Sequence, residues 1–161
     1  MTTNTRSPRS QRYNPANDDF QKEDFPFYWL SQVHGRYTIA LEKALKKVNM
    51  DIPRWRILFT LKQEGTCRVS EIAVHAIAKL PTVTKILQRM KEDGLVDTRI
   101  HSKDGRVTEV MITQKGIQAV DDIRLVTKEL FQQSFKGMTE AKIKRLNKLL
   151  EQLFDNLPEH L

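Results

Sequence analysis

The sequence contains very little cysteine and no long apolar run. Cys67 is the only cysteine among 161 residues, which excludes an internal disulfide. No apolar stretch approaches the roughly 20 residues that a bilayer-spanning helix requires. Residues 1–19 also lack the apolar stretch of a secretory signal. We therefore expect a cytoplasmic protein in a reducing compartment.

The sequence also lacks the common motifs of catalysis and metal binding. Its six glycines form no phosphate-binding loop, dinucleotide-binding turn or nucleophile elbow. His34, His75, His101 and His160 show none of the spacings of a metal site. Arg68 is the only sequence neighbour that would lower the pKa of Cys67, so a structural cysteine is favoured over a redox switch. We expect no enzymatic activity, metal or cofactor.

Positive charge is abundant. The net charge is +7 and the isoelectric point is near 9.6, which favours a polyanionic partner, although many basic proteins bind none. A length of 161 residues suits one domain, or one domain with a dimerisation element. Residues 1–22 have almost no apolar side chains, which predicts a flexible basic N-terminal arm. Arg6, Arg9 and Arg12 of this arm are interpreted as solvated, with contacts to DNA phosphates as the alternative.

Apolar residues at helical spacing predict a mainly α-helical chain. The expected helices cover about 25–48, 52–63, 71–76, 80–92, 114–135 and 140–157. Asp51, Ser70, Thr113 and Thr139 are the predicted N-caps. Two β-branched stretches, 95–100 and 107–112, predict a hairpin whose turn is 101–106, with Asp104-Gly105 in its middle. The short helices 71–76 and 80–92 with this hairpin predict a winged helix-turn-helix.

The unit from Lys79 to Val110 carries basic residues on its helix and hairpin, which is a shape that fits DNA. Here the sequence resembles the MarR family of bacterial transcription regulators, from about residue 24 to 157. The resemblance rests on Pro81-Thr82-Val83-Thr84-Lys85, Gly94-Leu95-Val96, Asp104-Gly105-Arg106 and Ile112-Thr113-Gln114-Lys115-Gly116. Residues 94–113 match the family pattern without a gap, whereas Ile77 and Lys79 depart from its common turn residues.

The resemblance implies a MarR-type domain over residues 23–158, with a winged helix at about 52–113 and dimerisation helices at about 25–48 and 114–158. It implies a homodimeric repressor that binds a palindromic, often AT-rich, DNA operator and is released by a small molecule. Each recognition helix would enter a major groove, and each wing would reach a flanking minor groove. A ligand-independent activator and a dimeric protein-interaction module are the alternatives, and the steep salt dependence of DNA binding would discriminate against the second.

Ten residues are the candidates for DNA contacts. Thr82, Thr84 and Lys85 lie where a recognition helix reads bases, and Pro81 suits a thymine methyl group. Arg68, Ser70 and Arg89 are expected at phosphates. On the wing, Arg106 suits a narrow minor groove, with Lys103 beside it and Asp104 orienting the turn or pairing with Arg106.

A ligand site is the second expectation. The family's small aromatic acids often bind between the DNA-binding lobe and the dimerisation helices, which implies an aromatic carboxylic acid here. Aromatic and polar side chains that suit such an acid are Trp29, His34, Arg36, Tyr37 and Trp55. Because helical stripes usually serve packing, the alternative is that the aromatic residues and His34 belong to the core.

Overall fold

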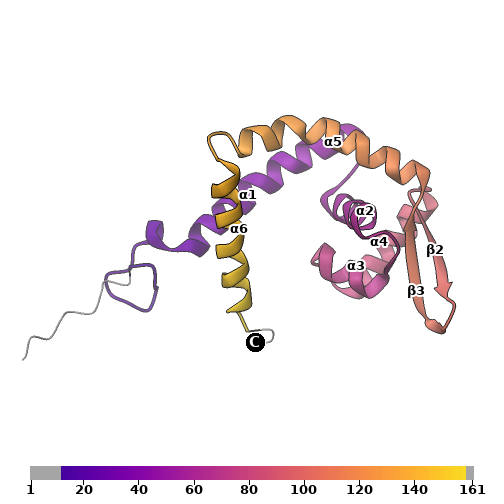
Figure 1. The fold of residues 1–161 in the computed structure, drawn as a ribbon, viewed down its shortest axis with the longest axis horizontal. Helices are drawn as coiled ribbons and strands as arrows, with labels where there is room; N and C mark the ends of the chain where they lie inside the picture. Colours follow the sequence, from indigo (N-terminus) through magenta and orange to yellow (C-terminus); the bar gives the residue numbers. More distant parts are fainter. Residues whose placement is uncertain (1–11, 159–161) are drawn as a thin grey trace, which may run out of the picture. The chain divides into compact units, whose positions relative to one another are not determined.

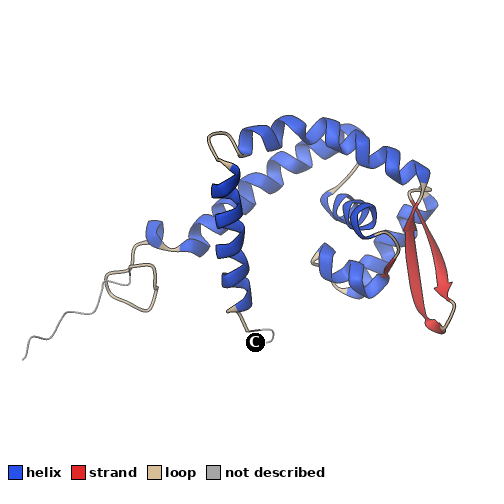
Figure 2. Ribbon diagram, in the orientation of Figure 1, coloured by secondary structure: helices blue, strands red, loops and turns tan. Residues whose placement is uncertain are grey.

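The fold is mainly helical with one small antiparallel sheet, as the sequence predicted (Figures 1 and 2). The structure is a computed structural model that describes residues 12–158. In chain order its elements are η1 (Lys22–Asp24), α1 (Pro26–Leu45), η2 (Lys46–Val48), α2 (Ile52–Glu64), β1 (Cys67–Arg68), α3 (Val69–Ala76), α4 (Leu80–Glu92), β2 (Val96–His101), β3 (Asp104–Ile112), α5 (Gln114–Ser134) and α6 (Glu140–Asp155).

Contacts within the chain define two compact units, Met1–Val126 and Thr127–Leu161, and the boundary falls inside α5. The core of the first unit consists of fully buried aliphatic side chains from five helices and two strands. Its largest members are Leu41, Leu45, Ile57, Leu58, Leu61, Ile72, Val83, Met90, Val96, Val110, Val120 and Ile123. Among the described helices, none has the length and apolar character that crossing a membrane would demand.

Side-chain caps fix where three of the helices begin. Asp51 Oδ1 accepts a 2.8 Å hydrogen bond from the Arg54 amide at the start of α2, as predicted. Thr113 Oγ1 accepts from the Gly116 amide at 3.0 Å, and Thr139 Oγ1 accepts from the Lys142 amide at 3.3 Å. These three bonds satisfy backbone donors that have no partner inside their helices, so the caps at Asp51, Thr113 and Thr139 are confirmed. The predicted cap at Ser70 was wrong, because α3 begins at Val69 with Arg68 as its N-cap, and the Arg68 amide donates to Glu71 Oε2 at 2.7 Å.

The helix-turn-helix is formed by α3 and α4 with residues 77–79 between them. Ile77 ends α3 in the left-handed conformation, with φ of 53°. This conformation is costly for a β-branched residue, because its Cβ crowds the backbone. The amide of Ala78 donates to the Ala73 carbonyl at 3.1 Å and closes the turn. Helix α4 then begins at Leu80 and ends at Glu92, the bounds that the sequence predicted.

The sheet has the strand order β1-β3-β2, and both pairings are antiparallel. Strands β2 and β3 form the predicted wing, but the predicted turn at 101–106 was wrong. His101 pairs with Asp104, so the turn is Ser102-Lys103 and Asp104 already belongs to β3. Ile100 pairs with Thr108, so residues 105–107 form a bulge. The bulge places Arg106 in β3 rather than in the turn.

The predicted N-terminal arm lies partly outside the described residues, and Arg6 and Arg9 fall there. In the described part, Arg12 Nε lies 3.0 Å from Asp24 Oδ2, and the amide of Gln21 donates to the Arg12 carbonyl at 2.8 Å. The boundary of the arm at residue 22 stays a prediction, as does the division of residues 23–158 into a winged helix and dimerisation helices.

Candidate functional site

Helix α4 presents one face to the core and the opposite face to solvent. Val83, Leu87 and Met90 are buried, at the helical spacing that defines a single face. The predicted contact residues Pro81, Thr82, Thr84, Lys85 and Arg89 are all exposed. Pro81, Thr82, Lys85 and Arg89 also gather around one shallow depression of about 240 Å³. The helix therefore offers a polar, basic surface that is held in place by its buried side.

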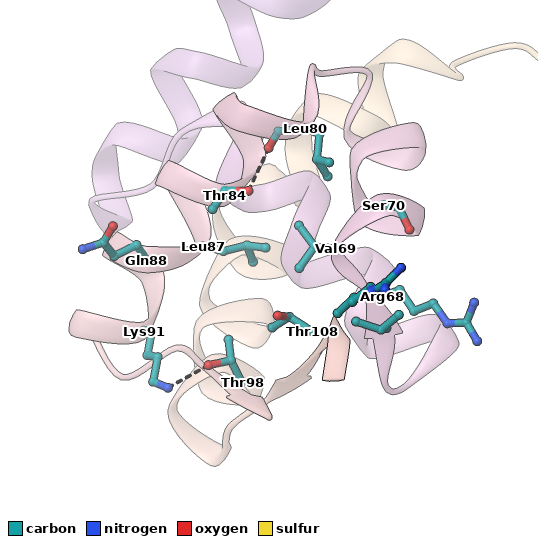
Figure 3. A pocket seen from close by; sticks show the side chains of 12 residues that line it. Arg68, Val69, Ser70, Leu80, Thr84, Leu87, Gln88, Lys91, Thr98 and Thr108 are labelled. Atoms are coloured by element: carbon teal, nitrogen blue, oxygen red, sulfur yellow. Dashed lines mark hydrogen bonds between the residues drawn. The ribbon is translucent and has the colours of Figure 1, made fainter. Parts of the chain in front are cut away.

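A larger groove separates α4 from the wing and from the start of α3 (Figure 3). Its volume is about 430 Å³. Leu87 and Val69 contribute apolar surface, whereas hydroxyl and cationic side chains line other parts of it. The polar lining includes Arg68, Ser70, Thr84, Lys91, Thr98 and Arg106. Lys91 Nζ donates to Thr98 Oγ1 at 2.7 Å and so connects α4 to β2 (Figure 3).

The predicted DNA-contacting cations carry free positive charge. Within residues 12–158, the side chains of Arg68, Lys85, Arg89, Lys103 and Arg106 form no ion pair with a carboxylate, and all five are exposed. Asp104 does not pair with the Arg106 guanidinium there; its Oδ1 accepts a 3.0 Å bond from the Arg106 amide. Asp104 thus shapes the bulge, and the positive charge of Arg106 stays available to an external anion.

Two other cations of the same region, Arg99 and Lys91, form ion pairs inside the chain. Arg99 Nε donates to Glu109 Oε2 at 2.7 Å, and this hydrogen bond lowers the pKa of Glu109. His101 Nε2 lies 3.9 Å from the other carboxylate oxygen of Glu109. Lys91 Nζ lies 3.5 Å from Asp97 Oδ1, and the pKa of Asp97 is lowered by the Thr98 amide first and by Lys91 second. The predicted DNA-contacting cations that have no carboxylate partner in residues 12–158 therefore lie on α4, on β1 and on the wing.

The predicted ligand residues fall into separate surroundings along α1 and α2. Trp29 is half exposed, and its Nε1 donates to the Glu23 carbonyl at 2.8 Å. His34 and Arg36 are exposed on α1. Tyr37 is half-buried, and burial raises the pKa of its hydroxyl, with the charge of Arg56 acting in the opposite direction. The charge of Arg56 therefore acts on the Tyr37 hydroxyl. Arg56 was not among the predicted ligand residues.

Trp55 contributes a buried polar atom that lacks a partner. Among the described residues, no hydrogen-bond acceptor meets its Nε1. The Trp55 ring packs at 5.6 Å against Phe59, and both border a pocket of about 270 Å³ together with Arg56, Thr60, Gln63, Glu64 and His75. A buried donor without a partner costs free energy. The sequence signal for Arg56 was a single cation directly before the apolar run 57–59 of α2.

Cys67 and the histidines offer little reactive chemistry in this fold. Cys67 is 5% exposed. Burial raises the pKa of its thiol, and Glu71 and Glu64 raise it further. A thiol with a raised pKa is a poor nucleophile, which agrees with a structural role. In the part of the chain that the structure describes, no three His, Cys, Asp or Glu side chains are placed to hold a metal ion.

Comparisons with known proteins place the chain among transcription regulators. The model of the MarR family matches residues 50–108. The HTH-type transcriptional repressor IacR of Pseudomonas putida is 59% identical over 145 residues, which are 90% of this chain and 87% of that protein. The homoprotocatechuate degradative operon repressor of Escherichia coli is 28% identical over 131 residues, 74% of this chain and 88% of that protein.

The fold of this chain is also similar to that of a solved structure. The crystal structure of NadR in complex with 4-hydroxyphenylacetate has a TM-score of 0.70 and 26% identity, and covers 78% of this chain and 89% of that one.

Proposed function

Because the chain belongs to the MarR family of transcription regulators, which bind DNA and are not enzymes, we propose that it is a homodimeric repressor acting in the bacterial cytoplasm. Two copies of α4 and the wing bind the half-sites of a palindromic operator, and a small aromatic acid releases them. The observation that carries the DNA-binding surface is the set of five exposed cations without carboxylate partners in residues 12–158: Arg68, Lys85, Arg89, Lys103 and Arg106.

The homodimer is supported by α6, the long helix of the second unit. Its residues Leu146, Leu149 and Phe154 are exposed, and the helix contains no buried residue among those described. An apolar stripe of this length requires a covering surface, and a second copy of the chain is the simplest one. We assign α1, α5 and α6 to the dimer interface, which leaves α4 and the wing free for DNA.

Salt dependence tests the DNA-binding surface. Each phosphate contact contributes about −0.9 to the slope of log affinity against log salt concentration. Substitution Arg89→Ala removes one contact from each protomer, so the slope becomes less steep by about 1.8. Lys62→Ala on the exposed face of α2 is the matched control and leaves the slope unchanged. An Arg89→Ala slope equal to that of the wild type removes this residue from the phosphate contacts.

An aromatic carboxylic acid is the ligand class that fits the pocket beside Trp55 best. The cation of Arg56 offers a polar contact, and the rings of Trp55 and Phe59 offer apolar walls. Two relatives support the class, since one is named for homoprotocatechuate degradation and another binds 4-hydroxyphenylacetate. Trp29, His34, Arg36 and Tyr37 remain candidate contacts of the same ligand in the dimer.

The ligand proposal is tested by titrating a panel of aromatic acids against the protein–operator complex. The Trp29→Phe variant leaves Trp55 as the only tryptophan, so fluorescence then reports on Trp55 alone. We expect one or more acids to change this fluorescence and to release the operator at the same concentrations. The Arg56→Gln variant should lose response to the acid while it still binds DNA. If no acid changes the affinity for the operator, the proposal is contradicted and the ligand-independent alternative is favoured.

A further inference from the structure

Gln88 is a polar residue of α4 that has no role in the assignments above. It is exposed, and it lies on the opposite side of the helix from the buried Val83, Leu87 and Met90. Gln88 lines the groove between α4 and the wing beside Leu87, and in Figure 3 its side chain extends away from that of Leu87. At 100° per residue, Gln88 shares the outermost face of α4 with Pro81 and Lys85. Any surface that α4 meets along this face meets Gln88 as well.

The Gln88 amide is held by a single weak hydrogen bond within the described chain. Its Nε2 donates to Glu92 Oε1 at 3.4 Å, which exceeds the usual range of 2.7–3.2 Å. This bond points the amide nitrogen toward the C-terminal end of α4. It leaves the carbonyl oxygen and the second N–H free. Gln88 therefore offers one acceptor and one donor side by side, at the outer face of the helix.

We propose that Gln88 is a specificity-determining residue that reads an adenine in the major groove of each operator half-site. Its Nε2 donates to adenine N7 and its Oε1 accepts from adenine N6, the paired contact that a glutamine makes with this base. Glu92 acts as a positioning residue that sets the orientation of the amide. This inference rests on the proposed function, since α4 must lie in the major groove for the amide to reach a base.

The neighbouring residues make adenine the specific choice. Lys85, one turn before Gln88, carries only donors and suits the two acceptors of guanine. Gln88 carries a donor and an acceptor, which match N7 and N6 of adenine and do not match two acceptors. The carboxylate of Glu92, which accepts from the Gln88 amide, would be repelled by a phosphate, so a phosphate contact of Gln88 itself is disfavoured. A base edge is therefore the contact that best satisfies Gln88.

Selection of bound sequences from a random DNA pool tests the inference. The wild type, Gln88→Ala and Gln88→Arg are compared, with Arg89→Ala as the control for a phosphate contact. We expect Gln88→Ala to lose preference at one A·T position of each half-site by about tenfold, and Gln88→Arg to select G·C there. Arg89→Ala should weaken binding to all sequences alike.

A modified base then tests the contact without any mutation. Replacing the adenine at that position by 7-deazaadenine removes N7 and nothing else from the base edge. The wild type should lose about tenfold in affinity for the modified operator, and Gln88→Ala should lose less than about twofold.

Two outcomes overturn the inference. They are an unchanged base preference in Gln88→Ala, and equal sensitivity of both proteins to 7-deazaadenine. A wild-type protein that selects no sequence from the pool would instead refute the proposed function, so the two failures are distinguishable.

Discussion

Among the glycines, Gly116 is the one at which an added Cβ would be most crowded. It lies in the first turn of α5, beside the base of the wing. A Cβ placed there would lie 2.7 Å from Ile112 Cγ1 and would overlap the Leu95 carbonyl oxygen. The carbonyl cannot easily move, because it accepts a 3.1 Å hydrogen bond from the Thr113 amide. Thr113 in turn donates from its hydroxyl to the Gly94 carbonyl at 2.6 Å. An alanine at Gly116 therefore forces α5 away from the wing.

The cost of Gly116→Ala follows from three contributions. Overpacking costs about 1–3 kcal/mol, and loss of the Leu95–Thr113 hydrogen bond costs about 1 kcal/mol. Alanine recovers about 1 kcal/mol, since it favours the helix over glycine. The free energy of unfolding should therefore fall by about 2 kcal/mol. For a chain of 161 residues this lowers Tm by about 4–8 °C.

Thermal unfolding at a fixed protein concentration measures this change, because dimer stability depends on concentration. Gly35→Ala is the matched control: Gly35 lies inside helix α1, and a Cβ there meets nothing within 4 Å. Within the protomer it receives the helix-propensity gain alone, so its Tm should rise slightly. A Gly116→Ala Tm equal to or above that of the wild type would refute the close approach of α5 to Leu95.

Three further predictions concern single side chains. Ile77→Asn should raise the free energy of unfolding, measured by denaturant titration, by about 1 kcal/mol, because asparagine tolerates the left-handed conformation and Ile77 is 79% exposed. Ile77→Val, which keeps the β-branch, should show no gain in stability in this titration. Cys67 should resist a thiol reagent in the folded protein and react on unfolding, because burial raises its pKa; labelling within seconds in the native state contradicts this. The pKa of Glu109 is lowered by Arg99, so this pair stabilises the fold at neutral pH and loses its effect as pH falls through that lowered pKa. The stability difference between wild type and Glu109→Gln should therefore shrink on acidification, and a difference that is independent of pH would exclude the pair as its cause.

Much of the fold could be predicted from local patterns in the sequence. Apolar residues at helical spacing gave the long helices, and α4 begins and ends at the predicted residues. The caps at Asp51, Thr113 and Thr139 were predictable because each acts within its own turn of helix. The family resemblance predicted the order of the helices and the wing, which the structure confirms.

Features that depend on contacts between distant residues were not predicted. Strand β1 has two residues, too few for a periodic pattern, and it exists because Cys67 and Arg68 pair with Val110 and Glu109. The turn of the wing was misplaced, because Asp104-Gly105 is a common turn pair that here forms part of a bulge. Arg56 was missed for a similar reason. Its place near Tyr37 comes from the packing of α2 and α1, which sequence spacing does not encode.

The binding of Arg106→Ala to a wild-type operator tests the central claim most directly, because it isolates the wing from the recognition helix. The Arg106 side chain is exposed, and within residues 12–158 it has no carboxylate partner, so its removal leaves the fold intact. The account predicts that Arg106→Ala binds the operator at least about tenfold more weakly, about 1.4 kcal/mol, while Lys62→Ala binds as the wild type does. Equal affinities of Arg106→Ala and the wild type would contradict the claim that α4 and the wing together hold the DNA.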